Sequence, residues 1–116
     1  MKKNDLIYIN HILDFVLKII EYTTNITESD FLENTLIQDA VIRNFEVIGE
    51  ASKQISSDFK NKYAFIEWRK IAGMRDKLIH DYIGVDNRAV WGVVVQIIPE
   101  FKNQLKSIIT TEGQNL

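Results

Sequence analysis

The sequence predicts an all-α protein, an up-and-down bundle of four main helices plus one short helix. Apolar residues recur at three- and four-residue spacing in four long segments, and no segment alternates apolar and polar residues as a half-buried strand would. A chain of 116 residues, 46% hydrophobic and 26% charged, is long enough and apolar enough for one core. We therefore predict a single domain over residues 5–110 and a frayed tail over residues 111–116.

The first main helix is predicted over residues 5–24, with Asn4 or Asp5 as its N-cap. A short turn or helix should follow, because Thr27 and Asp30 have the spacing of a capping box. One face of the main helix carries an apolar stripe that we expect to face the core: Leu6, Ile9, Leu13, Val16, Leu17 and Ile20.

The second main helix is predicted over residues 34–60. Gly49 lies in its interior, where glycine is less favourable than alanine by about 1 kcal/mol. We therefore expect another backbone or side chain to pass close to Gly49. The core side of this helix should contain Ile37, Ala40, Val41, Phe45, Ile48 and Ile55.

Gly84 separates the last two main helices. It is placed to end a helix over residues 65–83, which Gly73 either interrupts or occupies as an interior residue. Pro99 should kink the final helix, predicted over residues 87–110, because proline removes one backbone hydrogen bond and crowds the carbonyl four residues earlier. Asp86 should cap this helix, whose inward residues are Val90, Val94, Ile97, Ile98, Phe101, Leu105 and Ile108.

Composition narrows the class of protein. The absence of cysteine excludes disulfides and thiolate metal sites, which fits a reducing compartment. The apolar run near the N-terminus is interrupted by Asn10, His11, Asp14 and Lys18, so we expect neither a signal peptide nor a membrane span. These features predict a soluble, cytoplasmic protein, and a net charge of −2 gives it no global attraction for nucleic acid.

The charge is unevenly distributed along the chain. Residues 60–77 contain six basic residues against two acids, whereas residues 28–50 contain six acids against Arg43 alone. This pattern is either ordinary scatter on a solvated surface, or one face for an anionic ligand and another for a basic partner.

The stretch GMRDKLIHDYIG, residues 73–84, gathers the residues best suited to chemistry. On a helix, Arg75 and Tyr82 would lie two turns apart on one face, and Asp76 would contact His80. A carboxylate beside an imidazole orients it and favours its protonated form, which makes His80 a candidate acid–base catalyst. The alternative is that His80 only makes a charge–dipole contact with a helix end.

Arg75 and His80 do not share a face of a straight helix, because a spacing of five residues separates them by about 140°. A joint site then needs an arginine that reaches round, a distorted helix end, or a second subunit. Glu46 and Glu50, on the polar side of the second main helix, either face this cleft and pair with Arg75 or Lys77, or are solvated.

Arginine and histidine without a metal suit the cleavage of RNA. The ribose 2′-hydroxyl is an internal nucleophile, so histidine needs only to move a proton while the arginine fork binds two phosphate oxygens. No metal site or cofactor is expected, since His11 stands far from His80 without carboxylates at ligand spacing. Candidate RNA contacts are the cations Arg69, Lys70 and Lys77 and the aromatic residues Tyr63, Trp68 and Tyr82.

Arg75, His80 and Tyr82 form an R-x4-H-x-Y pattern that resembles the motif of HepT-like proteins, a branch of the HEPN superfamily. The resemblance extends over about residues 5–108. It is carried by the blocks RNFEVIGEASKQI (43–55), WRKIAGMRDKLIHDYIGVD (68–86) and VWGVVVQIIPEF (90–101). Two positions depart from the family's usual pattern: Glu67 replaces a proline, which should alter a helix start, and Asp76 replaces a frequent asparagine, which puts a carboxylate near the expected RNA phosphate.

The resemblance implies a HEPN-like helical homodimer with the motif at a cleft between subunits. It implies a metal-independent ribonuclease that acts as the toxin of a prokaryotic toxin–antitoxin pair, with Arg75 and His80 as catalytic residues and Asp76 as a supporting polar residue. Tyr82 would accept AMP from ATP, transferred by a separately encoded minimal nucleotidyltransferase that serves as antitoxin. The alternatives are a non-catalytic HEPN module that binds nucleotide or RNA, and a regulatory partner subunit of that nucleotidyltransferase.

Overall fold

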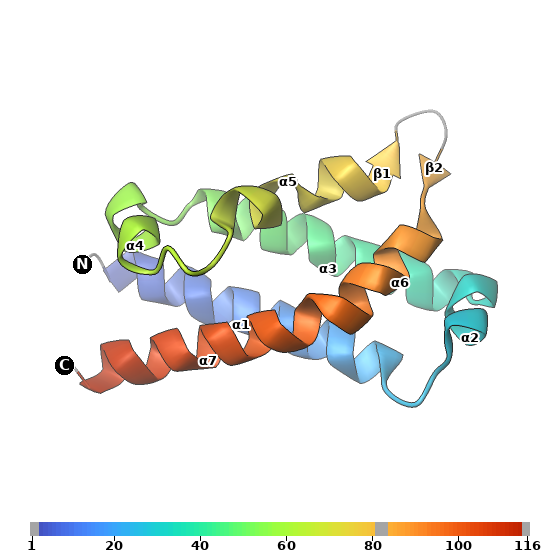
Figure 1. Ribbon diagram of the computed structural model, residues 1–116, viewed down its shortest axis with the longest axis horizontal. Helices are drawn as coiled ribbons and strands as arrows, with labels where there is room; N and C mark the ends of the chain where they lie inside the picture. Colours follow the sequence, from blue (N-terminus) through green and yellow to red (C-terminus); the bar gives the residue numbers. More distant parts are fainter. Residues whose placement is uncertain (1–2, 81–83, 115–116) are drawn as a thin grey trace.

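The computed structural model describes residues 3–80 and 84–114. Figure 1 shows an elongated helical bundle, with principal extents of 46 × 31 × 19 Å. Its elements are α1 (Lys3–Thr23), α2 (Glu28–Glu33), α3 (Thr35–Lys53), α4 (Ser57–Lys62), α5 (Trp68–Leu78), β1 (Ile79–His80), β2 (Gly84–Val85), α6 (Asn87–Gln96) and α7 (Ile98–Gln114).

The predicted helical bundle is confirmed in its main parts. Helix α1 packs against α3 and α7, and α3 packs against α5 on its other side. Helices α6 and α7 together take the place of the predicted last helix. The prediction was wrong in two respects: the described chain has two short helices, α2 and α4, instead of one, and a two-stranded antiparallel hairpin follows α5. None of the described helices combines the length and apolarity needed to cross a membrane.

The buried face of α1 is rotated from the predicted stripe. Leu17 is 39% exposed, and Ile12 and Ile19, which the prediction left out, are fully buried. The central residues of the predicted core on α3 are confirmed. The fully buried large side chains form one cluster that draws on α1, α2, α3 and α7: Phe31, Phe45, Phe101, Ile9, Ile12, Ile19, Ile48, Ile98, Leu105, Ile108, Val16 and Val41.

The second main helix ends earlier than predicted because of a contact with α1. Asp5 is 2% exposed, and its carboxylate accepts hydrogen bonds from the N–H of Ser56 at 2.8 Å and from its hydroxyl at 2.7 Å. The same hydroxyl accepts from the N–H of Phe59 at 3.2 Å and so caps α4. The prediction that Asp5 could cap α1 was therefore wrong. Asp5 instead fixes the turn between α3 and α4.

Gly49 and Pro99 do what the sequence predicted. A Cβ at Gly49 would lie 3.3 Å from the carbonyl oxygen of Ala72, so the absence of a side chain lets α5 approach α3 closely. Pro99 is the second residue of α7, and the helix breaks just before it, at Ile97. The break turns Ile97 outward to 42% exposed, so its predicted place in the core was wrong.

The predicted frayed tail is helical over most of its length. Helix α7 continues to Gln114, and Glu112 is only 3% exposed. Its carboxylate is held by side chains at the end of α4, as described below. Residues 115 and 116 lie outside the described residues.

Candidate functional site

The R-x4-H segment spans the end of α5 and the start of a hairpin. Gly73 does not interrupt α5, which ends at Leu78, two residues before His80. In the hairpin, Ile79 pairs with Val85 and His80 pairs with Gly84. The prediction of one helix over residues 65–83 was therefore wrong.

Two local features favour the hairpin over a longer helix. Gly84 has φ of +93°, a backbone conformation that is unstrained mainly for glycine, and it begins β2 instead of terminating a helix. The carboxylate of Asp86 then accepts from the N–H of Ala89 at 3.1 Å and caps α6, as predicted. Residues 84–86 thus commit the chain to a new helix.

This geometry removes two of the helical relations that the sequence suggested. Asp76 and His80 are not one turn apart on a helix, and the angle of about 140° between Arg75 and His80 no longer applies. Arg75 lies in the last turn of α5, and His80 lies on β1. For these two residues and for Lys77, the structure describes only the backbone. The Asp76 side chain is exposed. The catalytic pairing of Arg75 and His80 therefore stays a prediction. Tyr82, the predicted AMP acceptor, lies outside the described residues.

The candidate aromatic contacts at Trp68 and Tyr63 belong to the core. Trp68 is 8% exposed, and its indole N–H donates to the carbonyl oxygen of Tyr63 at 3.1 Å. Tyr63 is 6% exposed and packs against Phe59, with ring centroids 4.9 Å apart. The role predicted for these two rings, stacking on RNA bases, was therefore wrong, because both are covered by the protein's own side chains.

The predicted cations at the start of α5 are accessible. Arg69 is exposed, and Lys70 is exposed and pairs with Glu67 at 2.8 Å. The carbonyl of Glu67 accepts from the N–H of Ile71 at 3.1 Å, so α5 begins normally although Glu67 occupies the usual proline position. Both cations are exposed where an anionic ligand could reach them, Lys70 in competition with its pairing to Glu67.

The two acids of the α3 polar stripe differ in their surroundings. Glu50 has a side chain 72% exposed and pairs with Lys53 at 3.5 Å, which fits the solvated alternative. Glu46 is half-buried. For Glu46, a place in the cleft therefore remains a prediction.

Helix α6, which follows the hairpin, packs against α2. Phe31 and Trp91 stack with ring centroids 5.3 Å apart, and Arg88 pairs with Glu28 at 3.2 Å. The side-chain oxygen Oδ1 of Asn87 is buried and has no hydrogen-bond partner among residues 3–80 and 84–114. The sequence could not predict the burial of this oxygen, because it depends on how α6 packs against the rest of the bundle.

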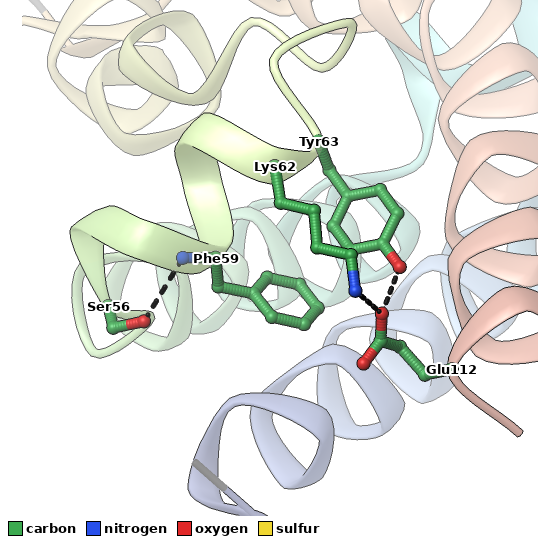
Figure 2. A network of polar contacts seen from close by, with 5 residues as sticks. All are labelled: Ser56, Phe59, Lys62, Tyr63 and Glu112. Atoms are coloured by element: carbon green, nitrogen blue, oxygen red, sulfur yellow. Dashed lines mark hydrogen bonds and ion pairs between the residues drawn. The ribbon is translucent and has the colours of Figure 1, made fainter. Parts of the chain in front are cut away.

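A second polar cluster, at the opposite end of the bundle, was missed by the sequence analysis. Figure 2 shows Lys62 and Tyr63, at the end of α4, converging on Glu112 of α7. The Lys62 ammonium lies 2.8 Å from Oε2 of Glu112, and the Tyr63 hydroxyl donates to the same oxygen. We call these three residues the α4–α7 clamp.

The clamp shifts the titration of all three groups. Hydrogen bonds from Lys62 and then Tyr63 lower the pKa of Glu112. Burial, followed by the hydrogen bond to Glu112, raises the pKa of Tyr63. The hydrogen bond to Glu112 raises the pKa of Lys62. The clamp is therefore fully formed at neutral pH, and it stabilises the bundle far from the hairpin (Figure 1). Within residues 3–80 and 84–114, no group of three or more His, Asp or Glu residues could hold a metal ion.

Comparison with known proteins places these features in one family. The family described as "Ribonuclease HepT-like" matches residues 12–108. A Thermococcus cleftensis protein named "Probable ribonuclease HepT" is 44% identical over 93% of this chain and 98% of its own length. A Caldanaerobacter subterraneus subsp. tengcongensis protein named "Putative RNase" is 40% identical over 90% of this chain and 94% of its own length.

A third relative is longer than this chain. A Methanocaldococcus jannaschii protein named "Gamma-glutamylcyclotransferase and putative RNase" is 44% identical over 99% of this chain, which spans 52% of that protein. Among solved structures there is no match. Because the family match covers most of the bundle, including the R-x4-H segment, the chain belongs to the HepT-like ribonuclease family.

Proposed function

We propose that this chain is a metal-independent ribonuclease in which Arg75 and His80 act together on one phosphodiester. The observation that carries the proposal is the end of α5 at Leu78, between the two residues. A continuous helix would direct them to different faces, whereas a helix end followed by a hairpin places them on separate backbone segments. Family membership and the names of the relatives support the same activity.

The chemistry requires only proton transfer and charge stabilisation. His80 takes the proton from a ribose 2′-hydroxyl, the 2′-oxygen attacks phosphorus, and the bond from phosphorus to the 5′-oxygen breaks. The products are a 2′,3′-cyclic phosphate and a 5′-hydroxyl, which gains a proton from a second acid. In a homodimer that acid would be His80 of the partner subunit. Arg75 binds the phosphate oxygens and stabilises the charge that develops on them.

We further propose that the ribonuclease acts as the toxin of a toxin–antitoxin pair, as the family resemblance implies. Its antitoxin would be a minimal nucleotidyltransferase that transfers AMP to Tyr82. An adenylyl group adds bulk and negative charge two residues beyond His80. The added phosphate would compete with RNA for Arg75, which accounts for neutralisation.

The test uses protein expressed without any partner and incubated with total RNA in EDTA. Wild type should cleave RNA and leave 2′,3′-cyclic phosphate ends, while His80→Ala and Arg75→Ala should lose cleavage. His11→Ala is the matched control, since His11 is the other histidine and lies exposed on α1. Its cleavage should equal that of wild type.

Intact mass, measured on the same samples, reports whether Tyr82 carries AMP. If unmodified wild type cleaves no RNA, the ribonuclease proposal is wrong. Equal RNA affinity in wild type and His80→Ala, without turnover by either, would instead favour the non-catalytic binding module.

A further inference from the structure

A groove between α1 and α3 has no role in the proposed chemistry. The groove is open to solvent. Its volume is about 400 Å³, which is within the range of ligand pockets. Its walls combine two cations, two aromatic rings and a polar floor, which is a mixed surface rather than an apolar one. The lining residues are Phe15, Lys18 and Tyr22 from α1 and Ala40, Arg43, Asn44 and Val47 from α3.

The two cations of the groove are not neutralised by their neighbours. Asp14 and Asp39 each stand four residues before a cation on the same helix, a spacing at which ion pairs form readily. Among the described residues, however, no ion pair joins Asp14 to Lys18 or Asp39 to Arg43. Lys18 lies over the Phe15 ring instead, with its ammonium 5.5 Å from the ring centroid. Both cations therefore line the groove with their charge available.

The aromatic rings give the groove its second chemical property. Tyr22 is 38% exposed, so part of its ring is open to a ligand, and Phe15 is half-buried beneath Lys18. The floor is fixed, because the Asn44 amide donates to the carbonyl of Ala40 at 2.7 Å. Cations next to accessible rings match a phosphate linked to an unpaired base.

We propose that the α1/α3 groove binds single-stranded RNA, with Lys18 and Arg43 on its phosphates and Tyr22 stacked on a base. The inference rests on the proposed ribonuclease function and extends it by adding a contact for the same strand outside the R-x4-H segment. Helix α3 packs against α1 on one side and α5 on the other, so a bound strand crosses a single helix to pass from the groove to α5. Because Asp14 and Asp39 reduce the local positive charge, the groove should hold only one or two phosphates.

The experiment measures binding by fluorescence anisotropy in a His80→Ala background, which separates affinity from cleavage. The probe is a fluorescein-labelled single-stranded uridine oligonucleotide. Lys18→Ala with Arg43→Ala should weaken binding by about tenfold and lower the slope of log affinity against log salt by about 1.4. Tyr22→Leu should weaken binding roughly fivefold. Double-stranded RNA should compete poorly, because its bases are already stacked.

A control variant with the same loss of charge tests whether the groove or the overall charge matters. Lys102→Ala with Lys106→Ala removes two cations from α7 and should change affinity less than about twofold, as expected for cations outside the binding site. Arg43→Lys should retain most of the affinity. Thermal unfolding of each variant tests whether it is folded. We expect folded variants, because the side chains of Lys18 and Arg43 are exposed.

The outcomes separate this inference from the function on which it rests. If wild type cleaves RNA but the Lys18/Arg43 variant binds as tightly as its background, the groove proposal is overturned and the ribonuclease stands. If binding depends on the groove and no protein cleaves RNA, the groove proposal holds and the ribonuclease fails. An equal loss of affinity in the α7 control also overturns the groove, because charge alone would then explain binding.

Discussion

The hydroxyl of Tyr63 can be removed without disturbing the packing around it, which makes Tyr63→Phe a sharp test of the α4–α7 clamp. The hydroxyl donates to Glu112, and the ring packs against Phe59. Phenylalanine keeps the ring and loses only the donor. Glu112 keeps its contact with Lys62, so the carboxylate is left with one of its two partners.

The expected loss of stability follows from the charge on the acceptor. A hydrogen bond to a charged group contributes about 1.5–3 kcal/mol to the free energy of unfolding. The remaining contact with Lys62 places Tyr63→Phe at the lower end, about 1.5 kcal/mol. A domain of this size has an unfolding entropy of roughly 0.24 kcal/mol/K, so the melting temperature should fall by about 6 °C.

Thermal and urea unfolding followed by circular dichroism measure this change. Tyr22→Phe is the matched control, since it removes the hydroxyl of a tyrosine that is 38% exposed, and its melting temperature should move by less than about 1 °C. A Tyr63→Phe variant as stable as the control would refute the clamp. A double-mutant cycle with Glu112→Gln should show coupling between the two positions.

Three further predictions concern pH and the base of the hairpin. The pKa of Glu112 is lowered in the folded protein, so its contribution to stability is complete above its unfolded pKa and is lost as pH falls through the folded pKa. Urea unfolding should therefore show a stability difference between wild type and Glu112→Gln that is constant from pH 7 to about pH 4.5 and shrinks below that pH. A difference that stays constant down to pH 2 would contradict this prediction. Asn87→Leu should raise the free energy of unfolding by about 1 kcal/mol, because it removes a buried acceptor that has no partner in the described part of the chain. A loss of stability would show that this oxygen is satisfied. Gly84→Ala should strain the hairpin by about 1–2 kcal/mol and reduce RNA cleavage, since φ at this position is +93°; unchanged cleavage would mean that the hairpin does not position His80.

The helices could be predicted because their signals are local. Apolar spacing located the four main helical segments, the capping box of Thr27 and Asp30 located α2, and Pro99 located the break before α7. Gly49 was also interpretable, since a glycine inside a helix points to close packing and α5 does approach there. Each of these signals depends on residues within a few positions of one another.

The errors come from contacts between distant parts of the sequence. Ser56 ends the α3 region because it donates to Asp5, 51 residues away. Glu112 extends α7 into the supposed tail because it accepts from Lys62, 50 residues away. No pattern within a short window reports such partners. The same limitation applies to Trp68, whose burial is decided by how α5 is seated on the core.

The candidate site shows a different division between sequence and structure. The residue types and spacing of the R-x4-H motif indicated its chemistry, and the family match includes that segment. The backbone that carries the motif was predicted wrongly, because periodicity treats the segment as one helix. A spacing of five residues is out of phase with the 3.6-residue turn of a helix, so a continuous helix would not suit the joint action on one phosphate that we propose for Arg75 and His80. Helix α5 ends at Leu78, between these two residues, Gly84 with φ of +93° begins β2, and Asp86 caps α6. An R-x4-H motif followed within six residues by a glycine and a capping residue is therefore better interpreted as a helix end than as a helix face.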